Sequence, residues 1–106
     1  MSKYNVLKLW KKRYGEAEDV WDYAGRLMKR SACGNPRSSF EPTIDHIRPL
    51  SKGGQDIEAN IEICHYTTNE EKGDDFPHWA TNGQRFHAEK SAGVPGGYEI
   101  VKEGEM

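Results

Sequence analysis

The chain has 106 residues, enough for one domain, and 35% of them are apolar, so the hydrophobic core is small. No stretch approaches the roughly 18 consecutive apolar residues of a membrane-spanning helix, and the N-terminus lacks the apolar core of an export signal. We therefore expect a cytoplasmic protein without a membrane segment. Residues 1–52 carry a net charge of +5 and residues 53–106 a net charge of −7, which favours a phosphate-contacting surface in the first half, with the acidic half facing away.

Two helices are predicted ahead of residue 32. In residues 4–14, Leu7, Trp10 and Tyr14 recur at helical spacing, and Gly15 is suited to end the helix. A second helix is predicted over residues 17–31, where Asp22 and Arg26 are four residues apart. Its apolar stripe consists of Val20, Trp21, Ala24, Leu27 and Met28. We expect this stripe to cover the back of a small sheet.

The middle of the chain predicts a strand, a long loop, a second strand and a short helix. Residues 33–39 form a loop, residues 41–46 a strand, and residues 51–59 a loop that contains Gly53 and Gly54. Residues 60–64 form the second strand. Thr67 or Thr68 is expected to cap a helix that runs to Lys72, with acidic residues in its first turn. Beyond residue 74 we predict irregular structure and one last strand over residues 98–102.

Residues 44–74 read IDHIRPLSKGGQDIEANIEICHYTTNEEKGD. The segment contains, in this order, an Asp-His pair on a strand, a Gly-Gly loop, an Asn at the second strand and an Asn on the helix. This is the order of the HNH nuclease module, which the chain resembles over roughly residues 30–74. The flanks YGEAEDVWDYAGRL and FPHWATNGQRF are similar to those of small stand-alone HNH proteins of bacteria and phages. The resemblance implies an α+β fold with a ββα-metal core.

The domain organisation that we expect from this resemblance is a single HNH nuclease domain over residues 1–106. Residues 1–32 would be a helical N-terminal extension packed on a small antiparallel hairpin. Residues 40–74 would be the ββα-metal core, and residues 75–106 a C-terminal extension.

The resemblance also assigns roles to four polar residues of the motif. His46 would be the general base, because imidazole accepts a proton near neutral pH. Asp45 and Asn69 would bind one divalent metal ion, Mg²⁺ or Mn²⁺, since both offer the hard oxygen donors that these ions prefer. Asn60 would hydrogen-bond the backbone across the loop and fix where His46 points. Successive strand residues face opposite ways, so Asp45 and His46 diverge unless the strand bends.

Four basic residues are candidates for contacts with the DNA backbone. Lys72 lies one turn beyond Asn69 on the same helix face, and the other three are Arg48, Lys52 and Arg37. Where related proteins carry four zinc-binding cysteines, this chain has Arg30, Cys33, His65 and Thr68. We therefore expect no structural zinc, with two reduced cysteines, and we expect the N-terminal helices to replace that staple.

The function implied is hydrolysis of DNA phosphodiester bonds to a 5′-phosphate and a 3′-hydroxyl, with one strand nicked at a time. A monomer would nick, whereas a homodimer could cut both strands. The alternatives are a nucleic-acid-binding module without catalysis, a toxin-type nuclease domain, and a small interaction domain with a fortuitous motif. The first requires loss of Asp45, His46 or Asn69, and all three are present. The second requires delivery segments, and we expect the chain to begin and end around the module.

Overall fold

Two α-helices and three small antiparallel sheets make up the fold of residues 2–104, the part of the chain that the computed structural model describes. In chain order the elements are α1 (Val6–Tyr14), β1 (Asp19–Trp21), β2 (Leu27–Lys29), β3 (Pro42–His46), β4 (Ile61–His65), α2 (Tyr66–Lys72), β5 (His78–Thr81), β6 (Gln84–Lys90) and β7 (Tyr98–Lys102). The α+β class is as expected. Within residues 2–104, no helix has the length and apolar character needed to cross a membrane.

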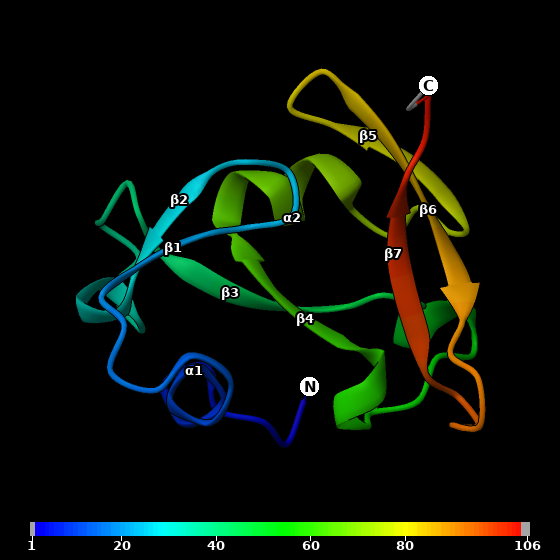
Figure 1. Cartoon of the computed structure of the whole chain (residues 1–106), viewed down its shortest axis with the longest axis horizontal. Helices are drawn as coiled ribbons and strands as arrows, with labels where there is room; N and C mark the ends of the chain where they lie inside the picture. Colours follow the sequence, from blue (N-terminus) through cyan, green and yellow to red (C-terminus); the bar gives the residue numbers. More distant parts are fainter. Residues whose placement is uncertain (1, 105–106) are drawn as a thin grey trace.

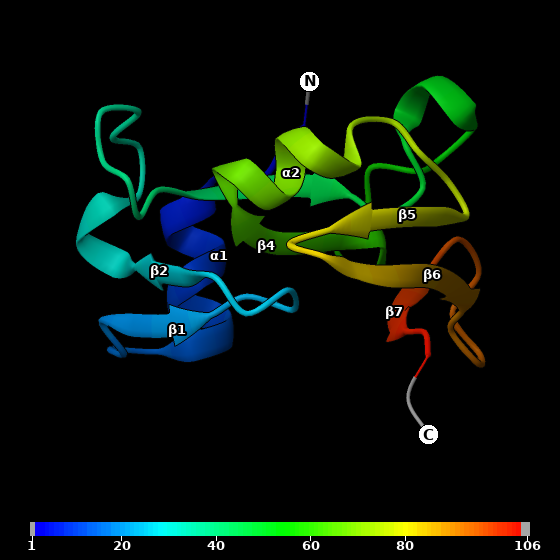
Figure 2. The ribbon, with the colours of Figure 1, turned by 90° about the horizontal axis from the view of Figure 1, so that it is seen from above.

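The centre of the molecule is a hairpin with a helix on one face. β3 and β4 are antiparallel, with Ile44 opposite Ile63 and Asp45 opposite Glu62, and α2 follows β4 directly and lies across this pair (Figures 1 and 2). α1 and the β1–β2 hairpin lie at one end of the pair, and the β5–β6–β7 sheet lies at the other (Figure 2). The predicted strand–loop–strand–helix order is therefore confirmed over residues 42–72.

The first helix ends where the sequence predicted. The Asn5 side chain accepts a hydrogen bond from the Lys8 backbone N–H at the start of α1, and Gly15 follows the last turn with φ 62°. Leu9 and Trp10 are buried and pack on Met28, Ile61 and Ile63. This apolar cluster attaches α1 to the back of β4, so residues far apart in the sequence support the hairpin from the side opposite α2.

The predicted second helix is wrong, because residues 19–29 form the β1–β2 hairpin. Its turn is closed by the Asp22 side chain, which accepts hydrogen bonds from the backbone N–H groups of Ala24 and Arg26, and by Gly25 with φ 87°. A short hairpin with a five-residue turn brings apolar side chains together much as a helical stripe does, so spacing alone did not separate the two. Arg26 and Asp22 do not form the expected helical pair of charged side chains.

The prediction of irregular structure after residue 74 is wrong for residues 78–90, which form β5 and β6. Asn82 and Gly83 connect these strands with φ 51° and 71°, values typical of the Asn-Gly turn that favours a two-residue hairpin. That dipeptide was the signal in the sequence. The predicted last strand is confirmed as β7, which pairs with β6. Trp79 and Phe86 are buried in a second apolar cluster with Ala24 and Ile47.

Candidate active site

Asp45 and His46 end strand β3, and their side chains have different partners, as the alternation of a strand requires. Asp45 is 7% exposed and faces α2, where the Lys72 ammonium nitrogen Nζ lies 3.4 Å from its Oδ2. That oxygen is buried but has no aligned hydrogen-bond donor among the described residues. Burial disfavours the charged form and raises the pKa of Asp45, and the Lys72 charge opposes this shift.

His46 faces the long loop between β3 and β4. Its Nε2 lies 2.8 Å from Oδ1 of Asp56, and the His46 side chain is 15% exposed. The Asp56 carboxylate also accepts hydrogen bonds from the Ser2 hydroxyl and from the Lys3 backbone N–H. Asp56 belongs to the acidic half of the chain, so the expectation that this half faces away from the site is wrong at this residue.

Asn60 ties together the two ends of the loop that carries Asp56. Its Oδ1 accepts from the Arg48 backbone N–H, and its Nδ2 donates to the carbonyl oxygens of Arg48 and Gln55. Asn60 is fully buried, and its own carbonyl accepts from the Ile47 backbone N–H. Its side chain has no hydrogen bond to His46, so any effect on the imidazole passes through the backbone on either side.

The loop needs a residue without a side chain at Gly54. A Cβ atom at this position would lie 1.8 Å from the carbonyl oxygen of Arg48, so only glycine permits the chain to pass so close to the end of β3. Gly53 has φ 86° and closes the preceding 3₁₀ turn Leu50–Lys52. The Gly-Gly pair of the motif thus returns the loop toward β3 and brings Asp56 near His46.

Asn69 lies on α2 alongside β3. Its Nδ2 donates to the Thr43 hydroxyl oxygen at 3.0 Å and to the Ile44 carbonyl oxygen at 3.3 Å. Both amide hydrogens are thus used, and the amide oxygen accepts no hydrogen bond within residues 2–104. One turn later, Lys72 Nζ donates to the His46 carbonyl oxygen. The two contacts hold α2 against the strand that carries Asp45.

The structure places Lys72 in the interior. Its side chain is fully buried, with Nζ beside Asp45 and 5.0 Å from the ring centre of Trp79. Lys72 was a candidate for contacting a DNA phosphate, but a fully enclosed ammonium group does not reach a ligand outside. Its position instead makes it the counter-ion of Asp45.

Arg48, Lys52 and Arg37 lie nearer the surface. The Arg48 guanidinium donates to the Lys52 carbonyl oxygen and to the Tyr98 hydroxyl, and it lies over the Phe76 ring. Arg48 also lines a groove of about 470 Å³, together with Lys90 and the 93–98 segment. Lys52 is exposed in the Gly-Gly loop, and Arg37 is exposed in the loop before β3.

The donor set around Asp45 suits a hard divalent ion. Asp45 supplies a buried carboxylate oxygen that lies beside the Lys72 charge but has no aligned hydrogen-bond donor in the described part of the chain. Asn69 supplies an amide oxygen, and both are ligands that Mg²⁺ and Mn²⁺ prefer. No three His, Cys, Asp or Glu side chains within residues 2–104 gather as a metal site. An ion held here would thus draw its other ligands from water and from substrate.

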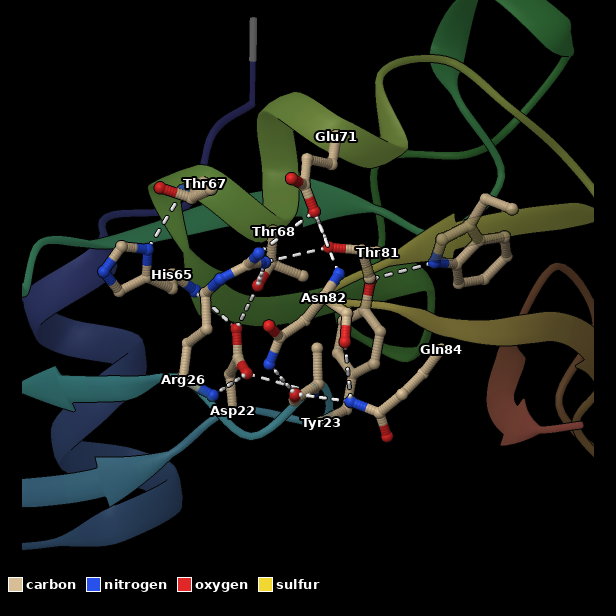
Figure 3. Close-up of polar contacts among 12 residues, drawn as sticks. Asp22, Tyr23, Arg26, His65, Thr67, Thr68, Glu71, Thr81, Asn82 and Gln84 are labelled. Atoms are coloured by element: carbon tan, nitrogen blue, oxygen red, sulfur yellow. Dashed lines mark hydrogen bonds and ion pairs between the residues drawn. The ribbon is translucent and has the colours of Figure 1, made fainter. Parts of the chain in front are cut away.

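Asp22 connects the N-terminal hairpin to α2. Its Oδ2 accepts from the Thr68 hydroxyl at 2.6 Å and from the His65 backbone N–H at 3.0 Å (Figure 3). Arg26 donates to Thr68 and pairs with Glu71 of α2 at 3.0 Å. Positions 65 and 68 are two of the four at which the resemblance implied cysteines in zinc-binding proteins. In this chain, Asp22 in the turn of the β1–β2 hairpin binds both residues, whereas a helix was expected to stabilise this region.

Glu71 extends the network to the C-terminal sheet. One of its oxygens accepts from the Thr81 hydroxyl and from the Asn82 backbone N–H (Figure 3), and these hydrogen bonds and that of Arg26 lower the Glu71 pKa to about 2. The expected Thr67 or Thr68 cap of α2 is wrong, because His65 Nδ1 accepts from the Thr67 backbone N–H. Nor are acidic residues found in the first turn of α2.

The family comparison agrees with this geometry. The model of the family described as HNH endonuclease matches residues 31–75, a segment that includes β3, the loop, β4 and α2. Residues 31–75 are an HNH endonuclease domain. Neither the curated proteins nor the solved structures gave a match. HNH endonucleases are phosphodiester hydrolases that act on DNA and generally use a divalent metal ion, and the β3–β4–α2 unit is the ββα-metal core that the family implies.

The sequence did not point to two residues that contact the site or its helix, Asp56 within the HNH domain and Asp22 before it. Asp56 lies in a loop whose acidic residues resemble ordinary solvated surface, and only the loop's return to β3 places it on His46. Asp22 was assigned to a helix, where it would have faced solvent. Its position three residues before Gly25, within the segment DYAG, is typical of a turn and was the available signal.

Proposed function

We propose that the protein is a divalent-metal-dependent DNA endonuclease in which His46 is the general base. The observation that carries the proposal is the arrangement at the end of β3. The imidazole of His46 follows the buried Asp45 carboxylate, whose Oδ2 lies beside the Lys72 charge but has no aligned hydrogen-bond donor within residues 2–104, and α2 presents the Asn69 amide along the same strand. A base beside a hard-oxygen donor set is what hydrolysis of a phosphodiester requires.

The reaction begins with a water molecule whose proton passes to a ring nitrogen of His46. The water oxygen forms a bond to phosphorus, and the bond between phosphorus and the 3′ oxygen breaks. The leaving 3′ oxygen takes a proton from solvent, which gives a 5′-phosphate and a 3′-hydroxyl. Asp45 and Asn69 would hold Mg²⁺ or Mn²⁺, and the bound ion would supply Lewis-acid stabilisation of the negative charge that develops on the phosphoryl group.

Several residues serve binding and positioning. Asn60 fixes the backbone on both sides of the loop, and Lys72 keeps the Asp45 carboxylate at one position on the inner face of β3. Arg48 and Lys52, with Arg37, contact the DNA backbone, and the groove beside Arg48 continues this surface toward Lys90. With one such site in each chain, a monomer cuts one strand per encounter.

Cleavage of supercoiled plasmid tests the proposal. With Mg²⁺ or Mn²⁺ we expect the nicked circle as the first product, and none with a chelator. DNA ligase should reseal the nick directly, because it joins a 5′-phosphate to a 3′-hydroxyl. His46→Ala should lower the rate by roughly 10²–10⁴-fold, the usual contribution of a general base, and leave folding and DNA binding intact.

His87→Ala is the matched control, because His87 is also partly buried and paired with carboxylates but lies on β6, outside the HNH domain. Its cleavage rate should equal that of the parent. Intact plasmid under every metal condition would favour the reading as a binding module without catalysis. Immediate linear product, with a dimer in sedimentation, would contradict nicking by a monomer.

A further inference from the structure

The pairing of His46 with Asp56 goes beyond the roles that the motif assigns. His46 stands at the end of β3, and Asp56 stands ten residues later, at the far side of the Gly-Gly loop. The loop is anchored at both ends by Asn60, through Arg48 and Gln55. The anchored loop therefore holds the Asp56 carboxylate beside the imidazole, and the 2.8 Å contact follows from the path of the loop.

Asp56 is itself held from a second direction. The Ser2 hydroxyl donates to its Oδ1 at 2.8 Å, and the Lys3 backbone N–H donates to its Oδ2 at 2.9 Å. The hydrogen bond from His46, followed by that from Lys3, lowers the Asp56 pKa to about 2. The carboxylate is thus ionised at neutral pH and can only accept hydrogen bonds.

The ionised Asp56 carboxylate determines which nitrogen of the neutral His46 imidazole carries the hydrogen. Because Asp56 only accepts, the ring nitrogen that faces it, Nε2, carries the hydrogen. In the neutral ring the other nitrogen, Nδ1, then has a free lone pair. Nδ1 has no hydrogen-bond partner within residues 2–104, so it is the nitrogen left to accept a proton.

We propose that Asp56 is the positioning residue of the base: it holds the His46 ring and its Nε2–H tautomer so that Nδ1 takes the proton from water, and the segment before α1 holds Asp56 in turn. The inference rests on the proposed role of His46 as base. Asp56 does not touch the substrate or the reacting atoms. After proton transfer, its negative charge lies beside the imidazolium, which stabilises that cation and disfavours rotation of the ring away from the site.

The test uses the full chain with ¹⁵N-labelled histidine and four variants. At alkaline pH, ¹⁵N correlation spectra report which ring nitrogen carries the hydrogen, and the His46 signals are assigned by their absence from His46→Ala. The parent should show the Nε2–H form. In Asp56→Ala the two tautomers should become mixed, whereas Asp56→Asn should retain more of the Nε2–H form, because an amide oxygen also accepts.

Plasmid cleavage supplies the second measurement. Asp56→Ala should lower kcat by roughly 10–100-fold, the usual effect of removing a group that orients another, with little change in KM. The kcat of Asp56→Asn should lie between the values for Asp56→Ala and the parent. Glu58→Gln is the matched control: Glu58 is another acid of the same loop, paired with Lys12 at 2.7 Å, and its loss should change neither the tautomer nor kcat.

The outcomes separate this inference from the proposed function. An unchanged His46 tautomer in folded Asp56→Ala overturns the positioning role. The role is also overturned if the ratio of the two tautomers changes by about tenfold or more while kcat stays within about twofold of the parent. Parent-level cleavage by His46→Ala overturns the proposed function instead. In that case a tautomer that still depends on Asp56 shows that the pair forms without serving catalysis.

Discussion

The contribution of the buried Lys72–Asp45 pair to the free energy of unfolding can be calculated and tested. Lys72→Met keeps the length of the side chain but removes the charge 3.4 Å from the Asp45 carboxylate. Two unit charges at that distance attract by about 5 kcal/mol at an effective dielectric constant of roughly 20. Removing one partner of a buried pair commonly costs about 3–5 kcal/mol. Without metal, we expect the free energy of unfolding to fall by that amount.

The loss should depend on pH. Burial raises the pKa of Asp45 in the folded protein, so the ionised carboxylate destabilises the fold, and stability falls as pH rises from the unfolded pKa, about 3.9, toward the folded one. Without Lys72, which lowers the folded pKa, this fall should extend to higher pH. The difference between parent and variant should therefore be small near pH 4 and reach its full size near neutrality.

Urea denaturation in a chelator-containing buffer, at both pH values, measures the effect. A loss of 3 kcal/mol lowers Tm by more than about 10 °C for a domain of this size. Lys12→Met removes an exposed lysine that is paired with Glu58, and it should change stability by less than about 1 kcal/mol. The double variant Asp45→Asn/Lys72→Met should recover much of the loss. A loss below about 1 kcal/mol, or one that is equal at both pH values, would refute this account of the pair.

Two further predictions concern the support of α2 and the binding of DNA. Asp22→Ala removes the acceptor of hydrogen bonds from Ala24, Arg26, His65 and Thr68; because several buried donors lose their partner, the free energy of unfolding measured in urea should fall by about 3 kcal/mol or more. Changing Arg48 and Lys52 together to Ala should weaken binding of His46→Ala protein to unrelated duplexes alike and flatten its salt dependence, since each phosphate contact contributes a slope of roughly −0.9.

Matched variants separate these effects from general ones. Asp19→Ala removes another hairpin acid, half-exposed and paired with Lys29, and should leave stability within about 1 kcal/mol of the parent. An equal loss in Asp19→Ala and Asp22→Ala would contradict the role of Asp22 as a link to α2. Lys8→Ala/Lys11→Ala removes the same charge from the exposed side of α1 and should flatten the salt slope less. A salt-insensitive affinity, or strong preference for one duplex, would contradict binding through phosphates.

The sequence by itself determined the central unit and its polar residues. The local spacing of side chains and the turn residues predict β3 and β4 within one residue and the end of α2 at Lys72, because such elements are encoded locally. The start of α2 was predicted two to three residues too late. The order of Asp45, His46, Asn60 and Asn69 identified the HNH domain for the same reason: it is a property of one continuous segment.

Tertiary structure alone decided what those residues contact. The stripe containing Val20 and Met28 suits either a helix or a hairpin, and the choice follows from Asp22, whose carboxylate closes the turn and also holds α2. Lys72 was expected at the surface, but β5 places Trp79 against it and encloses its charge beside Asp45. Asp56 meets His46 only because the loop returns along β3. Such contacts join segments distant in sequence, and no local spacing encodes them.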